Sequence, residues 1–206
     1  MSVLRARTLD ISVSWSLPSI LQSRVHEVWA RRFSSTLKDD LQYTPSECFE
    51  TFPFPTGWQS NEVVAQVGTR YYGFRAALMV RNNEGLTKTY NRFHDPDERD
   101  PDIIKLRELH AAMDRVVLDA YGWTDIQPTC EFILDYEDED DDEPGKASKK
   151  KKPWRYRWPD EVRDEVLGRL LELNAERALV EKSTAATVSK PRAKTRTKNT
   201  AQGTLL

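Results

Sequence analysis

The stretch SNEVVAQVGTRYYGFRAALMVR, residues 60–81, gives the clearest indication of how this chain folds. Its apolar side chains recur at intervals of three and four residues, which places them on one face of an α-helix. They are Val64, Val67, Tyr71, Phe74 and Leu78. Two interior glycines, at positions 68 and 73, each cost a helix about 1 kcal/mol. We therefore predict an amphipathic helix that either has a close packing partner at its glycines or bends there, and that ends at the NNEG stretch, residues 82–85.

Three more helices are predicted on the same grounds, and they span Ser19–Phe33, Asp102–Tyr121 and Pro159–Lys182. Apolar residues recur in each at helical spacing. Pro101 suits the first helical position of the second of these segments, and Gly122 suits its end. The sequence therefore predicts a mainly α fold with minor β.

The remaining ordered segments are predicted from their local chemistry. Leu9–Trp15 alternates apolar and polar residues, which is typical of a half-buried strand. Two closely spaced prolines favour an extended, aromatic-rich segment on the surface over Tyr43–Pro55. Leu86–Pro101 is interpreted as a loop.

Two charged segments are predicted to be disordered. Asp135–Glu143 holds eight acidic residues, and Lys146–Lys152 holds five lysines. Such blocks repel themselves and bury nothing, so residues 135–153 are interpreted as a linker. The tail over residues 183–206 is basic, lacks acidic residues and is expected to be disordered.

Composition bounds the class of protein. With 206 residues, a net charge of −2 and 38% hydrophobic residues, the chain suits one soluble domain plus disordered segments. No apolar run approaches the roughly 20 residues that a membrane span needs. The first residues do not resemble a secretion signal, and Cys48 and Cys130 form no paired motif, so we expect a cytoplasmic protein with reduced thiols.

The search for catalytic motifs is negative. The sequence has no glycine-rich nucleotide loop after a strand, no Asn-Pro-Pro-aromatic motif of amino-group DNA methyltransferases and no GxSxG motif. His26, His94 and His110 lack the spacing of zinc ligands. The HDPD stretch, residues 94–97, could present an acid–base pair, but a turn that begins at Asp95, with His94 packed against it, is the better interpretation.

One surface feature points towards a function. Within the helix predicted over Ser19–Phe33, basic side chains lie off the apolar stripe, and a lysine follows the helix. They are Arg24, Arg31, Arg32 and Lys38. Such a face either is merely solvated or follows DNA phosphates. His26 is either a structural histidine or a further contact to a phosphate or a base.

The same region resembles a known family. Leu21, Ser23, His26 and Trp29 match the pattern L-x-S-x-x-H-x-x-W, and the segments STLKDD (35–40), YTPS (43–46) and TFPFP (51–55) follow in order. This arrangement is similar to the end of the target-recognition domain in MmeI-like (type IIL) restriction–modification enzymes and their methyltransferase relatives. The segments from Gly85 to Trp123 and from Leu170 to Arg177 resemble the helical region that follows. The similarity covers about residues 10–180, apart from the acidic and lysine-rich insert.

The resemblance implies a domain layout. Residues 1–56 would form the end of an incomplete target-recognition domain and residues 57–134 a helical C-terminal region. The linker at 135–153, a C-terminal helix at 154–182 and a basic tail at 183–206 would follow.

The resemblance also implies a function. The family's nuclease and S-adenosylmethionine-dependent adenine methyltransferase domains are not in this sequence, so S-adenosylmethionine and Mg are expected only in those domains and no cofactor in this chain. The implied function is noncatalytic recognition of double-stranded DNA at Arg24, His26, Arg31, Arg32 and Lys38, in a truncated or split form. A methyltransferase or nuclease chain encoded nearby would be a partner. The alternative is a helical module that docks on a separate catalytic subunit.

Overall fold

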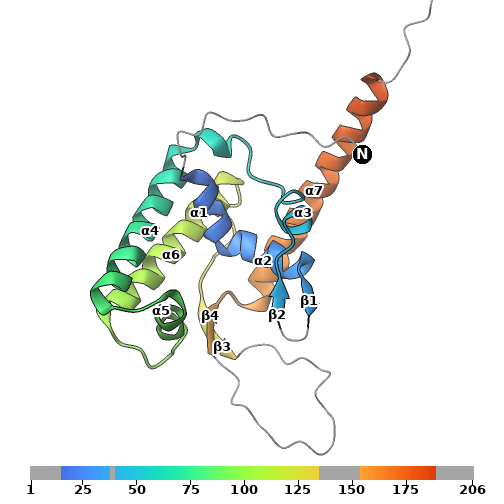
Figure 1. Ribbon diagram of the computed structural model, residues 1–206. Coiled ribbons are helices and arrows are strands. Elements are labelled where there is room, and N and C mark those ends of the chain that lie inside the picture. Colours follow the sequence, from blue (N-terminus) through green and yellow to red (C-terminus); the bar gives the residue numbers. More distant parts are fainter. Residues whose placement is uncertain (1–14, 38–39, 135–153, 189–206) are drawn as a thin grey trace, which may run out of the picture.

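The computed structural model describes residues 15–37, 40–134 and 154–188 (Figure 1). The helical elements are α1 (Ser16–Gln22), α2 (Arg24–Phe33), α3 (Pro45–Cys48), the short 3-10 helix η1 (Trp58–Ser60), α4 (Glu62–Asn82), α5 (Leu86–Phe93), α6 (Pro101–Ala120) and α7 (Asp160–Val188). The strands are β1 (Ser35–Leu37), β2 (Asp40–Gln42), β3 (Glu131–Leu134) and β4 (Trp154–Arg157). The predicted mainly α fold with minor β is confirmed. The alternating segment up to residue 14, the linker at 135–153 and the tail from residue 189 lie outside the described residues.

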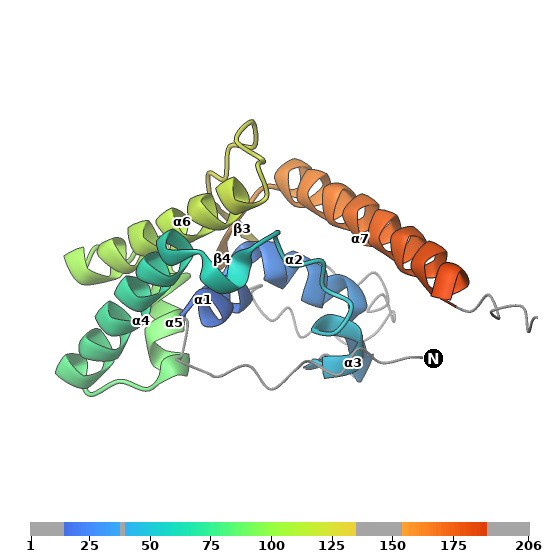
Figure 2. The same cartoon turned by 90° about the horizontal axis from the view of Figure 1, so that it is seen from above.

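The long helices α4 and α6 pack side by side (Figures 1 and 2). Asn61 caps α4 by accepting a hydrogen bond from the Val64 backbone N–H, at 3.1 Å. Asp100 caps α6 in the same way, with Pro101 at the first helical position. The helices predicted over Ser60–Arg81 and Asp102–Tyr121 are therefore confirmed, as is the predicted end at residues 82–85, where Asn83 is left-handed with a φ of 50°.

The close packing predicted at the glycines of α4 is found at one of them. A Cβ atom added to Gly68 would lie 1.6 Å from the Oγ of Ser19, whereas one added to Gly73 would meet nothing within 4 Å. Glycine at position 68 therefore lets α1 lie directly against α4.

The single helix predicted over Ser19–Phe33 is wrong, because the chain forms two helices that break at Ser23. Ser23 is extended, with a ψ of 156°, and its hydroxyl donates to the Ile20 carbonyl at 2.7 Å. Serine competes with helical backbone hydrogen bonds in this way. The backbone N–H of Arg24 then donates to Asp114 of α6 at 2.9 Å. A distant carboxylate thus replaces the helical acceptor and lets α2 start in a new direction.

Two other predictions of irregular structure need correction. Leu86–Phe93 is a helix, α5, rather than part of a loop, and it buries Thr89 and Phe93. Within Tyr43–Pro55, Pro45 occupies the first position of the short helix α3, where proline is tolerated. After α3 the chain turns at residues 49–51, and residues 52–55 form neither helix nor strand. Phe52 is 4% exposed and so belongs to the core rather than to the surface.

The main hydrophobic core joins segments that are far apart in the sequence. It contains Ile20, Trp29, Phe52, Val64, Val117, Trp158 and Leu170, among others. β3 pairs antiparallel with β4, Glu131 opposite Arg157, and this pairing was not predicted. α7, predicted over Pro159–Lys182, is confirmed and packs against α2 on the side away from α4 and α6 (Figures 1 and 2). The domain boundaries stay predictions.

Candidate nucleic-acid interface

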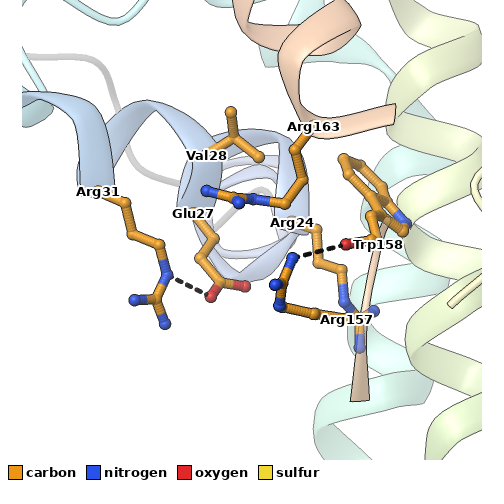
Figure 3. A pocket seen from close by; sticks show the side chains of 7 residues that line it. All are labelled: Arg24, Glu27, Val28, Arg31, Arg157, Trp158 and Arg163. Atoms are coloured by element: carbon orange, nitrogen blue, oxygen red, sulfur yellow. Dashed lines mark hydrogen bonds and ion pairs between the residues drawn. The ribbon is translucent and has the colours of Figure 1, made fainter. Parts of the chain in front are cut away.

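An arginine-rich groove lies between α2 and the β4–α7 segment (Figure 3). One end is lined by Arg24, Glu27, Val28, Arg31, Arg157, Trp158 and Arg163. The other end is an open depression of about 200 Å³, lined by Val28, Arg31, Arg32, Arg163, Asp164 and Leu167. We refer to the two together as the arginine groove. The first end leaves a space of only about 10 Å³, so a ligand reaches its arginines from the groove surface rather than by entering that end.

Two carboxylates, Glu27 in the arginine groove and Asp160 beside it, pair with the groove's arginines. The Nε of Arg31 donates to Glu27 at 2.9 Å, one helical turn away (Figure 3). Asp160, the first residue of α7, accepts from Arg157 at 2.7 Å and from Arg163 at 2.9 Å. These pairs hold the guanidinium groups at the groove surface.

Arg31 of α2 and Arg163 of α7 lie close enough for their charges to repel each other. The pKa of Arg163 lies below its usual range, first because burial penalises its charge and second because Arg31 repels it. A lowered arginine pKa marks a place where a further negative charge is favoured. The groove is therefore electrostatically suited to bind an anion between α2 and α7.

Arg24 is not on an exposed basic face, so that part of the sequence interpretation is wrong. It is 4% exposed, and its Nη1 donates to Asp114 Oδ2 at 2.7 Å. The same nitrogen lies 2.5 Å from His110 Nδ1, and Nη2 donates to the Tyr156 carbonyl at 3.1 Å. We refer to Arg24, His110 and Asp114 as the buried triad. It joins α2, α6 and β4.

The charges of the buried triad compensate each other. Burial alone would raise the pKa of the Asp114 carboxyl, but His110 and Arg24 outweigh it and hold that pKa below its ordinary value. For Arg24, burial favours loss of the proton, and the attraction of Asp114 overcomes this and raises its pKa. Arg24 therefore stays charged and Asp114 stays ionised in the interior, as a buried ion pair requires.

His26 is also buried, on the side of α2 that faces the aromatic segment. Its ring meets Phe52 edge to face at 4.7 Å, and its Nε2 lies 3.1 Å from the Tyr43 hydroxyl. Burial lowers the pKa of His26 to about 4, so the ring is neutral at pH 7. This supports the structural interpretation of His26 and gives no charge for a phosphate. Lys38 lies outside the described residues.

The segment TFPFP, residues 51–55, is covered by α7 rather than exposed. Asn174 donates to the Thr51 carbonyl at 2.6 Å, and Arg177 donates to the Phe54 carbonyl at 2.8 Å. Trp29 of α2 donates to the Thr51 hydroxyl at 3.2 Å. The TFPFP segment therefore lies between α2 and α7 and contacts both helices.

His94 has a structural role. His94 Nδ1 accepts from the Tyr156 backbone N–H at 3.0 Å, and burial is the first cause that lowers its pKa to about 4. Asp95 accepts from the Asp97 N–H at 2.9 Å, which confirms the predicted turn. Among the described residues, no group of three or more His, Cys, Asp or Glu side chains is arranged to hold a metal ion.

Of the predicted site residues that the structure describes, Arg31 and Arg32 are exposed in the arginine groove, whereas Arg24 lines it but is buried. Arg157 and Arg163 were not predicted. Their signal in the sequence is the run RYRW at residues 155–158, followed by Arg163 on the first turn of a helix. These arginines indicate a shared groove only when β4 and α7 are known to lie beside α2.

Comparisons with known proteins agree with the resemblance. Residues 8–56 match the family model of the MmeI target recognition domain. A DNA methyltransferase A of Bacillus subtilis (strain 168) is 29% identical over 109 residues, which are 51% of this chain and 11% of that protein. The chain thus spans a small part of this relative's length. No solved structure matches. None of the described helices is long and apolar enough to span a membrane.

Proposed function

We propose that this chain is a noncatalytic DNA-recognition and scaffold segment that acts within a restriction–modification methyltransferase system. The observation that carries the proposal is the position of Arg31 and Arg32. Both lie in residues 8–56, which match a target-recognition domain, and both are exposed at an open groove rich in arginine.

The physical argument for double-stranded DNA is the phosphate backbone. Phosphate contacts set the position of a recognition domain on the duplex, and arginine forms strong, directional hydrogen bonds to phosphate. Arg31 and Arg32 provide two such donors on the last turn of α2. We place the phosphate contacts there, with Lys38 as a third candidate, and assign Arg24 to the scaffold beneath them because it is buried.

The test is the salt dependence of binding to a fluorescein-labelled DNA duplex, followed by anisotropy. Each phosphate contact contributes about 0.9 to the slope of log affinity against log salt. For the Arg31→Gln/Arg32→Gln variant we expect the slope to fall by about 1.8. Arg81→Gln is the matched control, because Arg81 is exposed and paired with Asp102 on the far side of α4 and α6. Parent-like slopes in the double variant would contradict the proposal.

A second candidate function is docking on a separate catalytic subunit. It is supported by Leu171 and Leu179 of α7, apolar side chains that are 41% and 66% exposed. The TFPFP segment no longer supports it, since α7 already covers that segment. The test is capture of a methyltransferase chain at rising salt concentrations. Binding that does not weaken as salt rises, but is lost in Leu171→Ser/Leu179→Ser, would favour docking, since apolar contacts do not weaken with salt.

A further inference from the structure

We infer that β4 and the first turn of α7 supply a second set of DNA phosphate contacts, Arg157 and Arg163, which complete the arginine groove opposite Arg31 and Arg32. This inference rests on the proposed function. It extends the DNA-binding surface beyond residues 8–56, where the match to the recognition-domain model ends, to a segment about a hundred residues further along.

Specific contacts hold Arg157 and Arg163, the second wall of the groove, in place. Arg24, at the start of α2, holds the carbonyl of Tyr156 at 3.1 Å, so the next residue, Arg157, is fixed relative to α2. Trp158 is fully buried in the main core and anchors the turn into α7. The guanidinium of Arg163 then lies beside Glu27 and Val28 of α2 (Figure 3). Both walls are thus attached to one rigid core.

The shape of the groove favours a polymer over a free anion. Arg32 lines the open end and Arg157 the narrower end, with Arg31 and Arg163 at both. The four arginines are distributed over both ends of the groove, so a ligand that contacts all of them must extend along it, whereas one small anion would meet only part of the set. Arg157 is the least accessible of the four, with a side chain that is 13% exposed. Duplex DNA is therefore the ligand that we assign to both walls.

Asp160 moderates this surface. Its carboxylate is 55% exposed and accepts hydrogen bonds from both Arg157 and Arg163. A phosphate that binds these arginines must compete with that carboxylate. Asp160 therefore orients the two guanidinium groups while weakening indiscriminate binding to DNA. Replacing it with asparagine removes the negative charge but keeps a side chain of the same size at the start of α7.

The experiment compares the parent chain, four single variants and Arg31→Gln/Arg32→Gln in the same anisotropy titration from low to high salt. For Arg163→Gln and for Arg157→Gln we expect the slope to fall by about 0.9 each. The control is Arg169→Gln on the same helix, because Arg169 pairs with Glu165 and Asp125 away from the groove. Asp160→Asn is expected to bind duplex DNA several-fold more tightly at low salt. Inorganic phosphate serves as a competitor, and millimolar phosphate that abolishes binding at constant ionic strength would indicate a free-anion site.

The outcomes separate the inference from the proposed function. If Arg163→Gln and Arg157→Gln keep the slope of Arg169→Gln while Arg31→Gln/Arg32→Gln lowers it, the second wall is overturned and DNA recognition by α2 stands. If the parent chain itself shows no salt-dependent binding, both fail. Any loss of folding is read from the far-ultraviolet circular dichroism melt. If a glutamine variant has a lowered melting temperature, the Asp160→Asn variant still tests the inference. Unchanged or weaker DNA binding by a folded Asp160→Asn protein overturns it.

Discussion

Replacing Arg24 with alanine is expected to destabilise the protein severely, although Arg24 is a charged residue on a short helix. The side chain is buried and makes an ion pair with Asp114, which is fully buried. Removing one partner of a buried pair leaves an uncompensated charge and costs about 3–5 kcal/mol. In a chain of this size, 1 kcal/mol shifts the melting temperature by about 2–4 °C. We therefore expect a melting temperature about 6–20 °C lower than that of the parent.

The assay is thermal unfolding followed by circular dichroism at pH 7, with urea unfolding as a second measure. Arg31→Ala is the control on the same helix, since its pair with Glu27 is exposed and such pairs contribute about 0.3–0.5 kcal/mol. If Arg24→Ala and Arg31→Ala melt within about 2 °C of each other, a difference that corresponds to less than about 1 kcal/mol, the buried triad does not hold α2 in place.

The buried triad also predicts a pH dependence. The folded protein lowers the pKa of Asp114 below its unfolded value of about 4, so the unfolded state binds more protons in acid. The stability from this pair is present above the unfolded pKa and is lost as the pH falls through the folded pKa. Unfolding free energies measured from pH 6 down to pH 2 should therefore fall more for the parent than for Asp114→Asn. Parallel curves would contradict this.

The remaining predictions concern the core and the absence of catalysis. Trp29→Ala should cost about 3–5 kcal/mol in urea unfolding, because the ring is 1% exposed and packs against Phe33 and Phe52. Gly68→Ala should cost about 1–3 kcal/mol by forcing Ser19 and α1 away from α4, while Gly73→Ala, which meets open space, should not destabilise. Burial lowers the pKa of His26 to about 4, so its contribution is present above about pH 6.5 and is lost on acidification towards pH 4, a loss that His26→Gln should remove from the stability curve. The purified chain should transfer no methyl group from S-adenosylmethionine to DNA in a tritium assay, and incorporation above a heat-denatured control would overturn that expectation.

The parts of the fold that the sequence predicted are those whose determinants are local. α4, α6 and α7 are long, carry apolar residues at intervals of three and four, and begin with recognisable capping or proline residues, so local signals located them. The break at Ser23 has a local contribution from the serine hydroxyl, but its decisive acceptor is Asp114, 90 residues away. No pattern within Ser19–Phe33 contains that carboxylate, so the sequence there favoured one continuous helix.

Arg24 was expected on an exposed face because its partner, Asp114, is also distant in the sequence. A signal for its burial was present in α6. A charge next to an apolar stripe is normally solvated, which made exposure the reasonable expectation for Arg24. However, His110 and Asp114 are one turn apart on α6, on the face that also carries Leu106 and Met113. An aspartate on the buried face of a helix requires a cation. That requirement could have directed the search to Arg24, although it could not have selected Arg24 from the other arginines.

The arginine groove could not be predicted from the sequence because its two sides, α2 and the β4–α7 segment, are far apart in the sequence. Only the folded chain brings their arginines together. Arg31 is visible as a basic residue on a predicted helix, whereas Arg163 lies on the other side of a highly charged segment and pairs locally with Asp160. Local pattern alone makes Arg163 an ordinary solvated residue. Its lowered pKa beside Arg31 follows from the return of the chain after residue 153, which the buried Trp158 fixes. If the groove binds DNA, its affinity therefore depends on the core contacts of Trp158 as well as on the arginines. A conservative Trp158→Phe change should lower the salt-dependent slope as well as the stability, and an unchanged slope would show that each wall binds independently.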